Sequence, residues 1–221
     1  MTPMKLTANQ LKLLAMVTMT LDHLGVQLFP GALWLRVIGR LAMPIYAWMI
    51  AEGCAHTRDR KQYLLRLAGL ALVCQLVYFF AMGSLFQCIL VTFTLSVLVI
   101  YAIDSGSSAK AVLALCAALF VTVFLPRLLP GTDFAVDYSI WGVLLPVAVY
   151  LADTKPRKLL SATVLLALLA VDYGGVQWYG LAALLPLALY DGTRGKARIK
   201  WLFYLYYPLH LVAIYGLSLI L

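Results

Sequence analysis

Apolar runs about as long as a membrane-spanning helix recur from one end of the chain to the other. A helix needs about 20 consecutive apolar residues to cross a bilayer. Hydrophobic residues make up 64% of the 221 residues, and charged residues only 12%, which is about half their share in a soluble domain. Transmembrane β-strands would alternate in hydrophobicity, and these runs do not. The sequence therefore predicts an all-α, polytopic membrane protein that forms a single domain over residues 1–221.

The apolar runs predict nine helices joined by short connections. The expected spans are 11–29, 33–54, 62–82, 86–103, 110–126, 138–152, 158–173, 176–190 and 201–220. Lys5 and Lys12 come before the apolar stretch of the first span, as they would in a signal peptide. However, that span contains Asp22 and His23 and lacks an A-x-A cleavage site. We therefore expect it to be retained as the first membrane helix.

The positions of lysine and arginine test this count, because cytoplasmic loops collect these residues. With the N-terminus inside, the cytoplasmic ends and loops hold Lys5, Lys12, Arg58, Arg60, Lys61, Lys110, Lys155, Arg157, Lys158, Arg194, Lys196, Arg198 and Lys200. The outer loops hold only Arg127. A missed or an extra helix would scramble this division, so we expect nine helices in the inner membrane, with the N-terminus inside and the C-terminus outside. The net charge of +8 then reflects topology, and nucleic-acid binding is not expected.

The four cysteines lie in or beside apolar segments and form no CxxC pair. They are typical of small hydrophobic residues in a core. We expect neither a disulfide framework nor a metal site.

An acid and an imidazole stand side by side in the first span, at Asp22 and His23. Ionisable residues at mid-bilayer cost about 2.5–3.5 kcal/mol each, which makes them functional candidates. His23 follows Lys12 by eleven residues, a rise of about 16 Å and a net rotation of about 20° along a helix. Lysine and histidine thus share one face, which suits a co-substrate with an anionic head in the cytosol and a reactive end deep in the bundle. Alternatively, Asp22 and His23 only hydrogen-bond neighbouring helices.

Two arginines, Arg36 and Arg40, are four residues apart and share a face of the second span. We expect them to face Asp22 across a tight outer loop, as its counter-charges and as anchors for a carbonyl or carboxylate. Alternatively, both side chains reach to the outer interface. Pro44 lies one turn later and frees a backbone carbonyl, which needs another partner.

Five further residues are possible members of a site. They are Glu52 and His56 at the inner end of the second span, Asp137, and Tyr207 and His210 in the last span. Core packing around a satisfied histidine explains His210 equally well.

Several cytosolic cations suit the phosphates of a nucleotide co-substrate. Arg58 and Arg66 lie near the start of the third span, and Arg194 is flanked by Gly192 and Gly195. Glycine lets backbone approach a phosphate closely. Retention of positive charge on the inner side explains much of this charge by itself.

Four segments together resemble the TraX family, membrane proteins linked to N-terminal acetylation of F-type conjugative pilin. They are LKLLAMVTMTLDHLG, LRVIGRLAMPIYAWMIAEGCAHTRDRKQYLLRL, DYSIWGVLLP and YDGTRG with KWLFYLYYPLHL. The resemblance extends over nearly the whole chain. TraX proteins are similar in turn to the acyl-CoA-dependent membrane acyltransferases. Lys12 stands where many of those enzymes carry an arginine that ten intervening residues separate from a histidine, and Arg66 matches the first member of a basic pair.

The resemblance implies an acetyl-CoA-dependent acyltransferase. A thioester needs a base for the attacking group, a donor for the oxyanion, and cations for the coenzyme phosphates. His23 oriented by Asp22 would be the base, and Arg36 or Arg40 the donor. The coenzyme phosphates would meet Lys12, Arg66, Arg194 and Arg58. The acceptor would be a membrane-inserted pilin-like protein, or otherwise a glycan or a lipid.

Two other classes of function stay open. A proton-coupled transporter would use Asp22, His23 and Glu52 as a relay, although the sequence has no inverted repeats with paired broken helices. A non-catalytic assembly factor for pili or another envelope structure is the second alternative.

Overall fold

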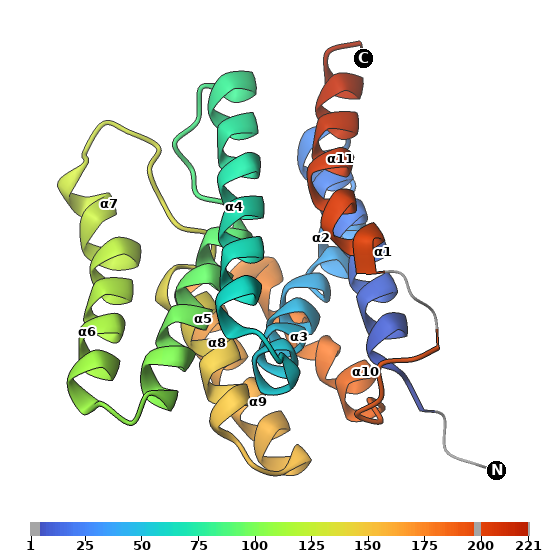
Figure 1. Ribbon diagram of the computed structural model, residues 1–221. Helices are drawn as coiled ribbons and strands as arrows, with labels where there is room; N and C mark the ends of the chain where they lie inside the picture. The colour runs from blue at the N-terminus through green and yellow to red at the C-terminus, as the bar shows by residue number, and fades with distance from the viewer. Residues whose placement is uncertain (1–4, 197–199, 221) are drawn as a thin grey trace. The chain divides into compact units, whose positions relative to one another are not determined.

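The computed structural model describes residues 5–196 and 200–220, and Arg198 lies outside these ranges. The regular elements within them are helices, which confirms the predicted all-α class. The elements are α1 (Ala8–Gln27), α2 (Leu33–Gly39), α3 (Ala42–His56), α4 (Arg60–Met82), α5 (Ile89–Asp104), α6 (Ser108–Leu119), η1 (Phe120–Phe124), α7 (Leu125–Leu128), α8 (Ser139–Leu151), α9 (Lys155–Tyr173), η2 (Gly175–Ala183), α10 (Leu184–Ala188) and α11 (Lys200–Ser218), as Figure 1 shows.

Some consecutive elements join end to end: α2 with α3, α6 with η1 and α7, and η2 with α10. Counted in this way, the part of the chain that the structure describes forms nine helical rods. Their positions match the nine expected spans, with ends that differ by a few residues.

Three of the nine rods differ from the expected regular α-helices. The fifth contains a π-helical segment at Phe120–Phe124. The second breaks at Arg40 and Leu41, between α2 and α3. Pro44 has no N–H to bond the Arg40 carbonyl four residues earlier, so the helix loses a rung there. The eighth rod is a 3₁₀-helix from Gly175 to Ala183 before its last turn becomes α-helical.

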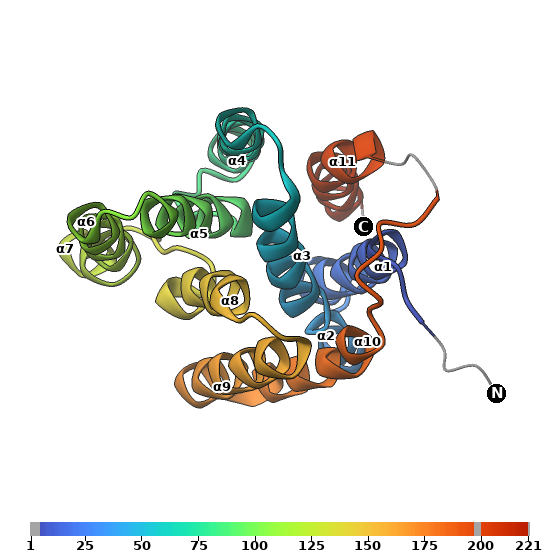
Figure 2. The ribbon, with the colours of Figure 1, turned by 60° about the horizontal axis from the view of Figure 1, so that its bottom comes forward.

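The helices group into two compact units, residues 1–49 with 155–221, and residues 50–154. In the first unit α1 contacts α2 and α11, while η2 contacts α2 and α9. In the second unit α5 contacts α4, α6 and α8, as Figure 2 shows. The buried side chains of Phe93, Val97 and Ile100 suit this central position of α5. The single domain over the whole chain stays a prediction.

The first and last helices, α1 and α11, run parallel to each other. Thr20 contacts Tyr206, and His23 contacts His210 three residues later on α1 and four residues later on α11. Residue numbers therefore increase in the same direction on both helices. A first and a last span point the same way when the number of crossings is odd. Which side of the membrane the N-terminus occupies stays a prediction.

Three rods among the described residues are long and apolar enough to cross a bilayer. They are Leu33–His56, Arg60–Met82 and Ser108–Leu128. The second and third of these carry large exposed apolar side chains, for example Phe80 and Leu113. Such faces are unfavourable in water and suit contact with lipid. The chain is a multi-pass, helical membrane protein.

Candidate functional site

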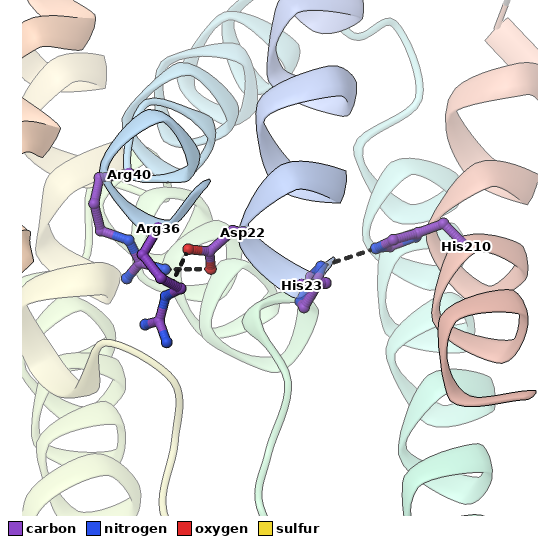
Figure 3. Close-up of polar contacts among 5 residues, drawn as sticks. All are labelled: Asp22, His23, Arg36, Arg40 and His210. Carbon is purple, nitrogen blue, oxygen red and sulfur yellow. Dashed lines mark hydrogen bonds and ion pairs between the residues drawn. The ribbon is translucent and has the colours of Figure 1, made fainter. Parts of the chain in front are cut away.

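Asp22 and His23 project from α1 toward different neighbours. Consecutive helical residues are turned by about 100°. Figure 3 shows Asp22 pointing toward α2 and His23 pointing to the other side, toward His210 on α11. The prediction that Asp22 orients the His23 ring was wrong, because the His23 Nδ1 atom lies 3.0 Å from the Nε2 atom of His210 instead.

Asp22 is the centre of an ion cluster with both arginines of the second rod. Arg36 Nε donates to Asp22 Oδ1 at 3.0 Å, and Arg40 Nη2 donates to Oδ2. The expected pairing of Asp22 with both arginines is thus present. The exposed fraction of the side chain is 15% for Asp22, 6% for Arg40 and 32% for Arg36. Arg40 is therefore a buried counter-charge, whereas Arg36 lies at the edge of the cluster.

Arg36 reaches the carboxylate through Nε, and its terminal amino groups point away from Asp22 in Figure 3. A guanidinium carries five N–H donors in a rigid fork. The partly exposed Arg36 is thus oriented by Asp22 through Nε, and this bond does not use its terminal amino groups.

His23 and His210 form a pair of rings between α1 and α11. His210 is buried, whereas His23 stays partly exposed. The Tyr206 ring stacks on the His210 ring, and the Tyr207 ring meets it edge-on. One turn before the His pair, the Tyr206 hydroxyl bonds Thr20. The site on this side of α1 consists of two histidines supported by tyrosines.

Sequence reasoning named His210 and Tyr207 as possible site members but did not join them to His23, and it missed Thr20 and Tyr206. Residues three or four apart lie on one helix face. This spacing holds on both helices. Tyr206 and His210 are four residues apart on α11, and Thr20 and His23 are three residues apart on α1. The missing information was which two helices pack together.

An open cavity of about 620 Å³ lies at the N-terminus of α1. Its lining residues are Thr7, Asn9, Gln10, Leu13, Thr193, Gly195 and Lys196. The Ala8 and Asn9 N–H groups donate to the Thr193 and Arg194 carbonyls at 2.8 and 3.2 Å. Thr7 and Gln10 form a capping box that satisfies two more N–H groups. The amides at this helix end are hydrogen-bonded within the protein. An anion in the cavity would therefore meet the positive charges of side chains such as Lys196.

Gly195 has a different role from the predicted approach to a phosphate. Its φ angle is +86°, and a Cβ atom there would lie 2.9 Å from Thr7 Oγ1. A glycine is needed because the loop packs directly on the start of α1. The same loop is ordered by Asp191, whose Oδ1 accepts hydrogen bonds from the hydroxyl and the N–H of Thr193. These bonds hold the pKa of the Asp191 carboxyl below its usual value.

Two predicted cations of the first unit are sequence neighbours of residues that line this cavity. Lys12 is next to the lining residue Leu13, and Arg194 is between Thr193 and Gly195, with an exposed side chain. Arg58 and Arg66 are exposed residues of the second unit, where Arg66 donates to Gln62.

The remaining predicted members are in the second unit. His56 Nδ1 lies 2.9 Å from the Glu52 carbonyl oxygen and 3.8 Å from its carboxylate. The Asp137 carbonyl accepts a hydrogen bond from Thr92 Oγ1 at 2.7 Å. Within the described ranges, no group of three or more His, Cys, Asp or Glu side chains is placed to hold a metal ion.

Comparison with known proteins gives the family. The TraX protein family matches residues 7–218. The chain belongs to the TraX family. The match includes the Asp22 cluster, the His23–His210 pair and the lining of the cavity.

Two relatives differ greatly in how much of the chain they match. The "Probable fimbrial assembly protein FimC, serogroup H1" of Dichelobacter nodosus is 27% identical over 244 residues, covering 93% of this chain and 93% of that protein. The "Uncharacterized protein RP591" of Rickettsia prowazekii (strain Madrid E) is 47% identical over 38 residues, 17% of this chain and 15% of that protein. No solved structure matches this TraX-family chain.

Proposed function

We propose that this protein is an inner-membrane acetyltransferase. It moves an acetyl group from cytosolic acetyl-CoA to the N-terminus of a membrane-inserted, pilin-like protein. The observation that carries the proposal is the TraX family match over residues 7–218, since this family is linked to pilin acetylation. The printed name of the Dichelobacter relative, a fimbrial assembly protein, supports a pilin-like acceptor.

His23 is the general base of the proposed reaction. Its ring is held in place by a hydrogen bond to His210, and a general base must be positioned within hydrogen-bond reach of the proton that it takes. His23 takes the proton of the acceptor nitrogen as that nitrogen attacks the thioester carbonyl. The carbon–sulfur bond then breaks, and the coenzyme thiolate receives the proton from His23. The products are the acetylated acceptor and free coenzyme A.

The proposed site also contains Asp22, Arg36 and Arg40, which have three different roles. The buried Arg40 balances the charge of Asp22, which in turn fixes the direction of Arg36. The outward-turned amino groups of Arg36 bind a carbonyl or carboxylate oxygen of a substrate on the side of α1 that faces away from His23. This proposal assigns substrate contact to Arg36 and leaves Arg40 with a supporting role.

The coenzyme head binds at the cavity by the N-terminus of α1. Lys196 lines the cavity, and Lys12 and Arg194 are sequence neighbours of lining residues. His23 lies ten residues beyond Leu13, about 15 Å along the helix. The flexible pantetheine arm of a coenzyme A thioester can cover such a distance.

Mass spectrometry of membrane proteins tests this function directly. We compare cells that produce the wild-type protein, cells that produce His23→Ala and cells that lack the gene. We expect one membrane protein with an acetylated N-terminus in the first strain alone. Identical acetylation of envelope proteins in all three strains would contradict the proposal, and acetyl groups on a glycan or lipid would move it to that acceptor.

A binding measurement separates the transferase from an assembly factor and from a transporter. A ligand that binds only the folded state stabilises it, by about 2.7 kcal/mol at a concentration of 100 Kd. Acetyl-CoA should therefore raise the melting temperature of the purified protein. Desulfo-coenzyme A should do the same, whereas adenosine is the control without phosphates. The absence of any shift at millimolar acetyl-CoA counts against the enzyme.

A further inference from the structure

The hydrogen-bond partners of His210 determine which of its nitrogens carries the proton. His210 Nδ1 lies 2.9 Å from the carbonyl oxygen of Tyr206, and its Nε2 lies 3.0 Å from His23 Nδ1. A carbonyl oxygen only accepts hydrogen bonds, so Nδ1 of His210 carries hydrogen. In a neutral imidazole the other nitrogen is then an acceptor. The hydrogen between the two rings therefore belongs to His23 Nδ1.

We propose that His210 is a positioning residue, which holds His23 in the tautomer with a free lone pair on Nε2. This inference rests on the proposed function, in which His23 is the base. It goes further because it assigns the reactive nitrogen of His23 and gives the last helix a part in the reaction. An isolated neutral imidazole favours hydrogen on Nε2, and His210, together with the Met19 carbonyl that also bonds the His23 ring, favours the other tautomer.

The His210 ring is itself fixed by Tyr206. The Tyr206 carbonyl accepts its Nδ1–H, and the two rings stack at 5.2 Å between centroids and 6° between planes. The Tyr206 hydroxyl bonds Thr20, whose own hydroxyl donates to the Met16 carbonyl at 2.9 Å. Thr20 must therefore accept from Tyr206. This chain of bonds ties α11 to α1 one turn away from the histidines and prevents rotation of the His210 ring.

Hydrogen bonding separates the roles of the two histidines. Both nitrogens of His210 are engaged, Nδ1 with the Tyr206 carbonyl and Nε2 with His23, and the residue is 6% exposed. When His23 Nε2 takes the acceptor proton, its Nδ1–H···Nε2 bond to His210 becomes charge-assisted and stronger. The proton leaves from His23 Nε2 to the coenzyme thiolate. His210 neither gains nor loses a proton in either step.

Nitrogen NMR of the purified protein labelled with ¹⁵N-histidine tests the tautomers without any activity assay. The chain has only three histidines, and each signal is assigned by its loss when that histidine alone is replaced. We expect protonated Nδ1 and unprotonated Nε2 on both His23 and His210. In His210→Phe the His23 signals should shift toward the Nε2–H form. A wild-type His23 already protonated on Nε2 would overturn the proposal, whatever reaction the protein catalyses.

Two replacements of His210 separate positioning from packing. Glutamine places its Oε1 acceptor near the position of the lost Nε2, whereas phenylalanine keeps the ring shape without an acceptor. We expect His210→Gln to retain a kcat within about tenfold of wild type. His210→Phe should lower kcat by about 10²–10⁴-fold with little change in KM for acetyl-CoA, since the base is misdirected while coenzyme binding stays intact.

The matched control is Leu209→Phe, which introduces the same side chain at an exposed neighbour on α11. It should leave kcat, KM and the melting temperature unchanged. Equal kcat values for His210→Gln and His210→Phe, whether both high or both low, would overturn the positioning role. If acetyl transfer fails for the wild-type protein but the NMR tautomers are as expected, the proposed function is wrong and the His210–His23 geometry stands.

Discussion

The backbone of Gly39 lies so close to Asp22 that a Cβ atom at position 39 would be 2.8 Å from the Asp22 α-carbon and 2.6 Å from its Oδ1. Helix α2 therefore rests directly on α1 at the charged residue. Arg36 lies three residues before Gly39 on this short helix, and Arg40 directly follows Gly39, so this contact determines whether their side chains reach the carboxylate. A small residue between two larger polar ones is how membrane helices bring their backbones together.

Gly39→Ala should therefore destabilise the protein and reduce acetyl transfer. The methyl group forces α2 away from Asp22, and such overpacking costs about 1–3 kcal/mol. Denaturant unfolding in detergent measures the loss. Gly69→Ala is the matched control, because Gly69 is also helical and a Cβ atom there has no neighbour within 4 Å. Equal stability of both variants would show that α2 moves aside without cost.

The two arginines should differ in what their loss affects. Removing one partner of a buried ion pair costs about 3–5 kcal/mol, so Arg40→Ala should lower stability at the low end of that range, because Asp22 keeps Arg36. Arg36 is more exposed, and Arg36→Ala should cost about 1 kcal/mol or less. It should nevertheless lower acetyl transfer at least about tenfold, with partial rescue by lysine, whose ammonium cannot reproduce a forked contact.

A double-mutant cycle completes this test. Asp22→Asn combined with Arg40→Ala should cost less than the sum of the single changes, because the pair is coupled through one contact. The two arginines are predicted to differ, with Arg40 supporting the structure and Arg36 contacting the substrate. Equal losses of activity and equal losses of stability in Arg36→Ala and Arg40→Ala would show that this assignment is wrong.

The sequence predicted the fold class and the nine rods well, because the length and the composition of an apolar run are local properties. It also predicted that Asp22 meets Arg36 and Arg40, since a tight loop between the first two spans leaves few other arrangements. The break at Arg40–Leu41 follows from Pro44 in the same local way. The 3₁₀ segment Gly175–Ala183 carried no such signal.

The partner of His23 could not be predicted from the sequence. His23 and His210 are 187 residues apart, and nothing local says that α11 packs on α1 rather than on another helix. Neighbours in the sequence misled the prediction, because Asp22 and His23 look like a pair although the helix turns them to different sides. The glycines around Arg194 misled it similarly, since a phosphate loop and a loop that caps a helix require the same residue.

The cavity at the start of α1 predicts which cations matter for the coenzyme. Arg194→Ala or Lys196→Ala should raise KM for acetyl-CoA while kcat changes little. Each lost charge-assisted contact is worth about 1.5–3 kcal/mol, or roughly ten- to a hundredfold in affinity. Lys158→Ala removes a charge predicted on the same side of the membrane and should change nothing. If all three variants titrate alike, the basic residues act only as topology signals.

The Asp191 carboxylate should make the stability of the loop that carries Arg194 depend on pH. Its pKa is lowered because the Thr193 hydroxyl and N–H bond the ionised carboxylate. The stability from this interaction is present above the ordinary carboxyl pKa of about 3.9 and is lost as pH falls through the lowered value. Asp191→Asn should therefore melt below wild type at pH 6. The difference should disappear as the pH falls below about 4, whereas parallel curves from pH 6 to pH 3 would contradict this role.

The rod Ser108–Leu128 allows a direct test of the predicted topology. Its 21 residues span about 30 Å, the thickness of the hydrocarbon core, and it carries Lys110 and Arg127 near opposite ends. Both side chains are exposed, and the prediction puts Lys110 inside and Arg127 outside. In a variant without Cys54, Cys74, Cys88 and Cys116, a membrane-impermeant maleimide should label Arg127→Cys in intact cells. It should label Lys110→Cys only after lysis. The reverse pattern would place the N-terminus outside and the proposed coenzyme cavity away from the cytosol, whereas labelling of both in intact cells would mean that this rod does not cross the membrane.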